Sequence, residues 1–229
     1  FAIAERMTAQ IRGLNMAAKN ANDGLSMLAT IENATNDVTD MLQRIRELAV
    51  QAVNDTNGDT DRGYLQDEVT SLLAEIDRVA SQTVYNNKVL LDGNLSGNIQ
   101  VGTEATQSIT FSIDSIATAD IGDGTDALST ISVATSSDAS DALVVISAAI
   151  EQVAGHRASY GAMQNRLEYT VSNLLNVAEF TTAARSRIED ADFAGESARL
   201  SKAQVLQQTG TAMLAQANAA SQLALQLIR

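Results

Sequence analysis

Several residue types are missing from this sequence or scarce in it. It contains no cysteine, no proline and no tryptophan, and aromatic residues make up 3% of it. Without cysteine, the chain can form no disulfide, no thiolate metal site and no cysteine nucleophile. Because proline disrupts helix interiors, its absence leaves very long helices possible. The scarcity of aromatics favours thin seams of Ala, Leu, Ile and Val between helices over a broad globular core.

Basic residues are also in the minority. The chain has 15 Lys and Arg against 28 Asp and Glu, which gives a net charge of −13. This charge repels phosphate backbones and anionic lipid, so we expect no nucleic-acid partner. No run of about 18 apolar residues is present, so we expect no membrane span. No signal-peptide pattern opens the sequence, and export would need another route.

Apolar and small residues recur at alternating steps of three and four along three stretches of the chain. This period is typical of helices that pack as coiled coils, and it predicts helices over about 1–53, 60–82 and 140–188. The stretch Asn54 to Gly58 has turn chemistry, and Asp59 or Thr60 is expected to cap the second helix. The second helix should therefore pack antiparallel on the first, in a bundle of three helices.

Two glycines lie inside the first predicted helix. Gly13 and Gly24 each cost a helix interior about 1 kcal/mol relative to alanine. The helix is therefore either held by partners or broken near Asn22, Asp23 and Gly24. We favour one continuous helix.

The middle of the chain has a different character. Residues 85–113 combine Asn and Gly with alternating apolar residues, which predicts a region of one or two small hairpins. Residues 114–139 are rich in Asp, Ser, Thr and Gly and have weak periodicity, so we interpret them as a surface connection.

The end of the chain is uncharged from Ala203 to Ile228. Its many Gln, Asn, Ser and Thr side chains make it too polar for a bilayer. It nevertheless carries an apolar stripe, which is expected to be buried by a partner helix. The stripe consists of Leu206, Met213, Leu214, Leu223, Leu225 and Ile228.

No set of residues predicts catalysis. His156 is the single histidine, and we interpret it as a packing or surface residue. The paired acids Asp190 and Asp192 belong to a charged helix boundary without signs of a pocket. The glycines lack the spacing of a phosphate-binding loop. We therefore expect neither enzymatic activity, nor a cofactor, nor a metal.

Several long runs of this sequence resemble bacterial flagellin. The first half contains IRGLNMAAKNANDGLSMLATIENA and LQRIRELAVQAVNDTN. The second half contains NRLEYTVSNLLNVAEFTTAARSRIEDADFA and VLQQTGTAMLAQANAASQLALQLIR. The resemblance covers nearly the whole chain except residues 114–139, where flagellins vary most. This identifies a short-insert flagellin, with the hook-filament junction protein or another helical secreted assembly protein as the alternative.

The resemblance implies a mainly α fold with a small β region. Residues 1–189 would form an elongated, rod-like bundle of long antiparallel helices with a β-hairpin, the rod-like inner filament domain. Residues 190–229 would be the C-terminal half of the innermost filament-core domain. Flagellins begin with a further apolar helix, and we expect that this N-terminal segment is missing here.

The resemblance also implies function, partners and sites. It implies a structural subunit that polymerises through its terminal helices into the flagellar filament for motility, outside the cell after passage through the flagellar export apparatus. Its partners would be other flagellin subunits, the export chaperone, the filament cap and hook-associated proteins, and the host Toll-like receptor that senses flagellin. Receptor contacts would be Arg44, Leu48 and Glu68, with Leu48 exposed. Possible O-glycosylation positions are Ser129, Thr130, Ser132, Thr135, Ser136 and Ser137.

Overall fold

The structure is a computed structural model that describes residues 2–227. Its contacts divide the chain into two units. We call Gly13–Asn176 the bundle unit, and the described residues up to Arg12 together with those from Val177 the terminal unit. Helices α1 (Ala2–Val53) and α3 (Ser136–Leu227) contribute to both units, while α2 (Asp59–Gln82) belongs to the bundle unit.

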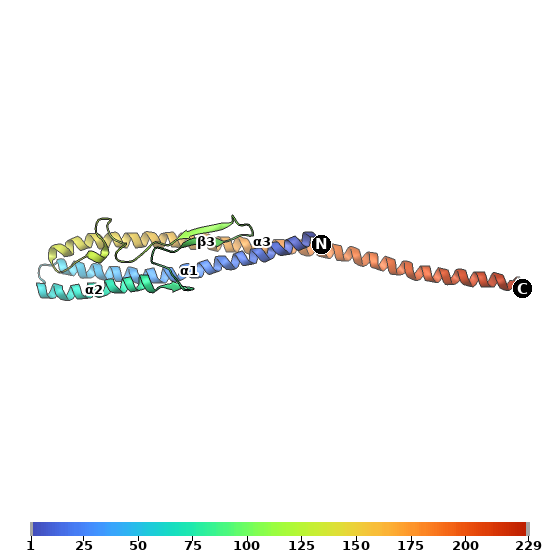
Figure 1. Ribbon diagram of the computed structural model, residues 1–229, viewed down its shortest axis with the longest axis horizontal. Helices are drawn as coiled ribbons and strands as arrows, with labels where there is room; N and C mark the ends of the chain where they lie inside the picture. Colours follow the sequence, from blue (N-terminus) through green and yellow to red (C-terminus); the bar gives the residue numbers. More distant parts are fainter. Residues whose placement is uncertain (1, 228–229) are drawn as a thin grey trace. The chain divides into compact units, whose positions relative to one another are not determined.

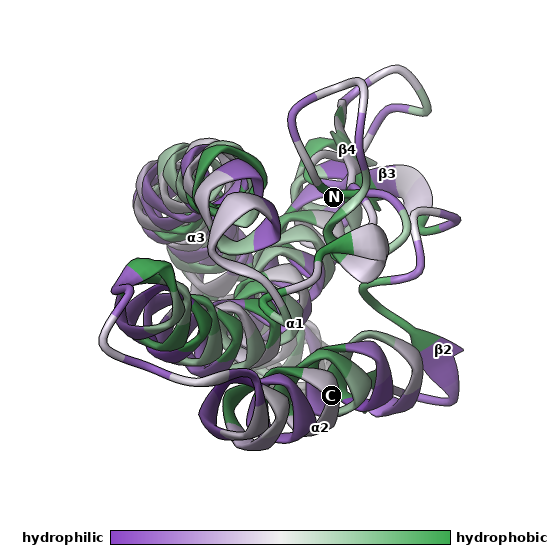
Figure 2. Cartoon of the chain, turned by 90° about the vertical axis from the view of Figure 1, so that its left-hand side faces the viewer, coloured by the Kyte–Doolittle hydropathy of each residue, from purple (hydrophilic) through white to green (hydrophobic). Residues whose placement is uncertain are grey.

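The three helices of the bundle unit run along one another, as expected (Figure 1). The partners that join them give their directions. The Ser136 hydroxyl donates to the Val53 carbonyl at 2.8 Å, and Gln164 donates to Glu32 at 3.2 Å, so α3 is antiparallel to α1. Arg62 of α2 contacts Ala52 of α1, and Glu68 further along α2 contacts Arg44 earlier in α1, so α2 is also antiparallel to α1. Figure 2 shows the apolar faces of these helices turned toward one another.

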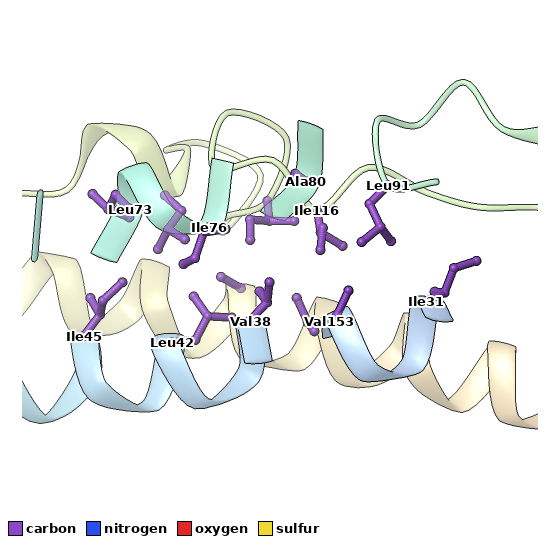
Figure 3. Close-up of a cluster of buried hydrophobic side chains, with 14 of the residues drawn as sticks. Ile31, Val38, Leu42, Ile45, Leu73, Ile76, Ala80, Leu91, Ile116 and Val153 are labelled. Carbon is purple, nitrogen blue, oxygen red and sulfur yellow. The ribbon is translucent and has the colours of Figure 1, made fainter. Parts of the chain in front are cut away.

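The core of the bundle unit follows the three-four period of the sequence. Ile31, Val38, Leu42 and Ile45 of α1 are fully buried and face side chains from α2, α3 and the connecting segments (Figure 3). Each buried aliphatic side chain of this kind contributes roughly 1.5–3 kcal/mol. The periodic positions therefore supply the driving force for packing these helices.

A buried arginine fixes the turn between α1 and α2. Arg62 donates from Nε to the Ala52 carbonyl at 2.8 Å and from Nη2 to the Asn54 carbonyl at 3.3 Å. These are carbonyls that the end of a helix leaves without an intrahelical partner. The N-cap of α2 is Gly58, not Asp59 or Thr60 as expected. The Asp61 carboxylate accepts the backbone N–H of Gly58 at 3.1 Å. This is the hydrogen bond that the third residue of a helix makes to the N-cap residue in a capping box.

Two small hairpins lie in the region where they were expected. Strands β1 (Val84–Tyr85) and β2 (Lys88–Val89) pair antiparallel, as do β3 (Ser96–Gln100) and β4 (Ser108–Ser112). The first turn places Asn86 and Asn87 at φ angles of 49° and 61°. Asparagine tolerates this left-handed conformation better than most residues, which explains the Asn-Asn pair.

Helix α1 is continuous and does not break near Gly24. Its glycines, Gly13 and Gly24, allow the hairpin of β3 and β4 to approach the helix closely. A Cβ at Gly24 would lie 2.5 Å from Ile99 Cδ1, and one at Gly13 would lie 2.6 Å from Thr103 Cγ2. Three turns of helix separate the two glycines, so both face the same side. Asn20 Nδ2 also donates to the Gln100 carbonyl at 3.2 Å. Contact with the hairpin compensates the low helix propensity of the two glycines.

The segment between β4 and α3 is not the surface connection that was expected. It is an ordered run that includes a short 3-10 helix, η1 (Leu128–Thr130), and an isolated bridge between Gly122 and Ala127. Six of its apolar side chains join the core: Ile113, Ile116, Ile121, Leu128, Ile131 and Val133. The segment therefore covers the helices as part of the packed structure.

Helix α3 begins and ends at different residues from those predicted. It starts at Ser136, because the Thr135 hydroxyl accepts the Asp138 N–H at 3.1 Å and acts as an N-terminal cap. It continues past Ile188 to Leu227, and no proline interrupts it. The division of the chain into domains at residue 189 stays a prediction.

Candidate assembly and recognition surfaces

The last part of α3 presents apolar side chains to solvent. In the terminal unit, Leu206 and Leu214 are exposed, and Met213 is 71% exposed. These three belong to the apolar stripe predicted from the sequence. Leu223 and Leu225 belong to α3, but their side chains, like Ile228 as a whole, lie outside what the structure describes. We call residues 203–227 the assembly segment.

The assembly segment has no charged side chain. Gln204, Gln207 and Gln208 interrupt its apolar character, and none of the helices described within residues 2–227 is long and apolar enough to cross a membrane. Burying uncharged amides and apolar groups avoids the large penalty for removing ions from water. Its composition therefore suits burial against other protein helices.

The start of α1 shows how α3 receives a partner helix within the terminal unit. Ala4 of α1 and Ala178 of α3 are both buried. Arg185 Nη1 also donates to the Thr8 hydroxyl at 3.2 Å. Within the terminal unit, α1 thus contacts α3 before the assembly segment begins.

Two of the three predicted receptor contacts form an exposed ion pair. Arg44 Nε donates to Glu68 at 2.8 Å, and its Nη1 donates to Glu47 at 3.1 Å. The hydrogen bond that Arg44 donates to Glu68, followed by the one that it donates to Glu47, raises the pKa of Arg44 above its ordinary value. The pair thus links α1 and α2 on the outside of the bundle unit.

The third predicted contact, Leu48, is not exposed. Its side chain is 1% exposed and belongs to the core together with Ile45 and Ala49. The expectation that Leu48 presents a contact surface was wrong for this structure, because Leu48 lies on the apolar seam of α1.

The predicted glycosylation positions differ in accessibility. Ser129, Thr130, Thr135 and Ser137 are exposed, whereas Ser132 and Ser136 are half-buried. The Ser136 hydroxyl is held by the Val53 carbonyl and Thr135 caps α3, so both have structural roles. The Thr130 hydroxyl donates to the Ala127 carbonyl at 2.7 Å. Ser129 and Ser137 are exposed and take no part in these contacts.

His156 belongs to a small cluster that sequence analysis did not predict. Its Nδ1 lies 3.0 Å from Asp114 Oδ2, and its ring stacks on Tyr160 at 6.4 Å between centroids. The Tyr160 hydroxyl accepts the Asp114 N–H at 3.3 Å, and burial raises the pKa of Tyr160 to about 12. The cluster fastens the segment after β4 to α3. Its contacts join only side chains and backbone of the chain itself.

The part of the chain that the structure describes contains no candidate metal site. There, no group of three or more His, Cys, Asp or Glu side chains is placed to hold an ion. Two features stand out instead: an uncharged helix with exposed apolar side chains in the terminal unit, and the tight packing of the bundle unit. Together they are typical of a helical structural protein.

Comparison with known proteins shows to which family of helical structural proteins this chain is similar. The family model of the bacterial flagellin N-terminal helical region matches residues 1–96, and that of the C-terminal helical region matches residues 143–228. A flagellin of Bacillus subtilis is 41% identical over 259 residues, a match that covers 100% of this chain and 85% of that protein.

Solved structures agree with this relationship. A crystal structure of Bacillus cereus flagellin is similar at a TM-score of 0.59 and 29% identity, covering 68% of this chain and 88% of that one. A flagellar hook-associated protein from Vibrio parahaemolyticus reaches a TM-score of 0.69 at 13% identity, covering 80% of this chain and 95% of that one. At that identity the likeness shows a shared fold only.

The chain belongs to the bacterial flagellin family. It is a structural subunit of the flagellar filament. The comparisons do not favour the alternative identification as a hook-filament junction protein.

Proposed function

We propose that the assembly segment joins neighbouring subunits in the filament by burying its apolar stripe. The observation that supports this is the exposure of Leu206, Met213 and Leu214 on an uncharged helix. Burying each of these side chains would contribute roughly 1.5–3 kcal/mol before the cost of ordering the subunits. Several such helices around one axis would supply much of the association energy.

Polymerisation of the full-length protein tests this proposal. We expect Leu214→Gln to raise the concentration at which filaments form, because the variant buries an amide in place of an apolar group. Gln208→Ala in the same segment is the matched control and should polymerise like the wild type. Electron microscopy and sedimentation would measure both. Equal polymerisation of the Leu214→Gln variant would contradict the proposed role.

The same segment is proposed to depend on its partners for stability. Gly210 lies inside it, and helix propensity alone leaves an isolated helix marginal in water. In dilute, partner-free protein, amide exchange should be fast over Ala203 to Leu227 and slow over Leu143 to Ile188. Strong protection of the assembly segment in the monomer would contradict this.

Further partners follow from the family. We propose that an export chaperone covers the apolar stripe before assembly and that the chain leaves the cell through the flagellar export apparatus. The filament cap and hook-associated proteins would contact the assembled subunits. We also propose that the chain has no enzymatic activity, because its sequence predicts no catalytic set of residues.

Recognition by the host receptor that senses flagellin is proposed to use the exposed pair Arg44 and Glu68, with Leu48 supporting α1 from the core. The pair Glu75 and Arg78 on α2 offers a matched control, because it is another exposed ion pair. Arg44→Ala should weaken receptor signalling, whereas Arg78→Ala should not. Equal signalling by both variants would count against this recognition surface.

Glycosylation is a separate proposal. Ser129 and Ser137 are exposed hydroxyls beside a buried run and could carry sugars without disturbing the core. The intact mass of filaments from the native source would exceed the polypeptide mass. A mass equal to that of the polypeptide would exclude this modification.

A further inference from the structure

Methionine is the sulfur-containing residue of this protein that an oxidant can modify. The sequence has six methionines and no cysteine. Met213 is 71% exposed and Met16 is 54% exposed, whereas Met27 is buried. Because access of the oxidant to the sulfur governs susceptibility, Met213 and Met16 should react before Met27.

Met213 has a particular place in the assembly segment. Gly210 and Ala217 precede and follow it on the same face of α3, at helical spacings of three and four. Met213 is thus a long apolar side chain between two small ones, the shape of a knob that enters a neighbouring helix. Leu206 continues the same face seven residues earlier. Met16, by contrast, lies on α1 in the bundle unit.

We propose that Met213 is an oxidation-sensitive site that controls self-association of the subunit. Hydrogen peroxide transfers one oxygen atom to Met213 Sδ: the peroxide O–O bond breaks, an S–O bond forms, the sulfur loses two electrons, and the peroxide is reduced to water. The product, methionine sulfoxide, is polar and chiral. Burial of the assembly segment would then have to desolvate a strong hydrogen-bond acceptor that has no prepared partner.

The assembled state protects the same atom. If the stripe is buried between copies, the sulfur of Met213 is covered in filaments and open in free subunits. Oxidation therefore acts on subunits before assembly and leaves finished filaments largely unchanged. This inference rests on the proposed role of the assembly segment, and the experiment below separates the two.

The experiment treats free, full-length subunits with dilute hydrogen peroxide and then induces polymerisation. Wild type, Met213→Leu and Met16→Leu are compared, each with and without peroxide. Leucine keeps the apolar character and cannot be oxidised, and both positions are exposed, so neither change disturbs the core. Peptide mass spectrometry gives the oxidation at each methionine, and circular dichroism confirms that the helices remain.

We expect peroxide to raise the critical concentration of wild type and Met16→Leu by about tenfold or more, while Met213→Leu polymerises as before. Treatment with methionine sulfoxide reductases of both stereospecificities should restore polymerisation of the wild type. Equal loss of polymerisation in Met213→Leu, or normal polymerisation of wild type carrying the sulfoxide at Met213, would overturn the inference. Failure of untreated Leu214→Gln to differ from wild type would instead contradict the proposed role of the segment.

Discussion

Asp77 of α2 holds Thr118 through two hydrogen bonds. Its carboxylate accepts the Thr118 backbone N–H at 2.8 Å and the Thr118 hydroxyl at 2.9 Å. Thr118 is buried, so these donors have lost contact with water. One exposed carboxylate thus fastens the segment between β4 and α3 to the bundle.

Asp77→Ala should lower the free energy of unfolding by about 1–3 kcal/mol, because it leaves both donors of Thr118 unpaired. Asp77→Asn keeps one acceptor and should cost less. Asp67→Ala, which removes another exposed carboxylate from α2, is the control and should change stability little. Urea unfolding followed by circular dichroism measures all three. A loss from Asp67→Ala as large as that from Asp77→Ala would contradict the argument.

Two glycines should respond to alanine in opposite directions. A Cβ at Gly122 would overlap the backbone carbonyl of Asp126, which a side-chain rotation cannot relieve. Gly122→Ala should therefore destabilise the protein by about 1–3 kcal/mol. At Gly63 within α2, a Cβ meets nothing within 4 Å, so alanine should stabilise by up to about 1 kcal/mol. Thermal unfolding would compare the two variants, and a shift of both in the same direction would be inconsistent with the structure.

Alkaline pH should weaken the fold through Tyr160. Its side chain is 3% exposed, and burial raises its pKa to about 12. Because the folded pKa lies above the ordinary value near 10, neutral Tyr160 stabilises the folded state fully below pH 10. This contribution, about 2 kcal/mol, is lost as pH rises from about 10 to about 12.

Unfolding by urea at several pH values would show the difference between wild type and Tyr160→Phe. The variant should be less stable near pH 8, having lost the acceptor for the Asp114 N–H, and the gap should narrow above pH 10. Ultraviolet titration should find one of the four tyrosines ionising late. A constant gap across this pH range would refute the assignment.

Alanine variants of Leu48 and Arg44 should distinguish the contribution of core packing to stability from that of surface charge. Leu48→Ala should cost about 2–5 kcal/mol, because it leaves a cavity in the core beside Ile45 and Ala49. Arg44→Ala should leave the free energy of unfolding nearly unchanged, because its partners are exposed. Chemical denaturation measures the free energy of unfolding of both variants. A small effect of Leu48→Ala would contradict the burial of Leu48 in the core.

The sequence was sufficient where burial follows a helical period. Ile31, Val38, Leu42 and Ile45 could be placed in the core from their spacing alone, because a helix presents one face to its neighbours. At Leu48 the resemblance to flagellins suggested exposure, and the structure shows a buried side chain instead. The uncharged assembly segment was also evident, because the absence of charge over so long a stretch is visible in the residues themselves.

Other features depend on contacts between distant parts of the chain. Ile116, Ile121 and Leu128 have no helical or strand period, so their burial follows from the surface on which the segment lies. Arg62 is buried because its partners are the backbone carbonyls of the preceding helix end, which no side-chain pattern encodes. The cap at Thr135 lay within a run of similar Ser and Thr residues, any of which could have started α3.

The bridge between Gly122 and Ala127 has a practical consequence for protein engineering. It closes an exposed tip, Asp123 to Asp126, between two buried side chains, Ile121 and Leu128. Because the ends of the tip are already held together, a foreign peptide placed between Gly124 and Thr125 would add only the small entropy of a longer loop. The tip is thus a suitable position for displaying an epitope in every subunit, with the core beneath it left unchanged.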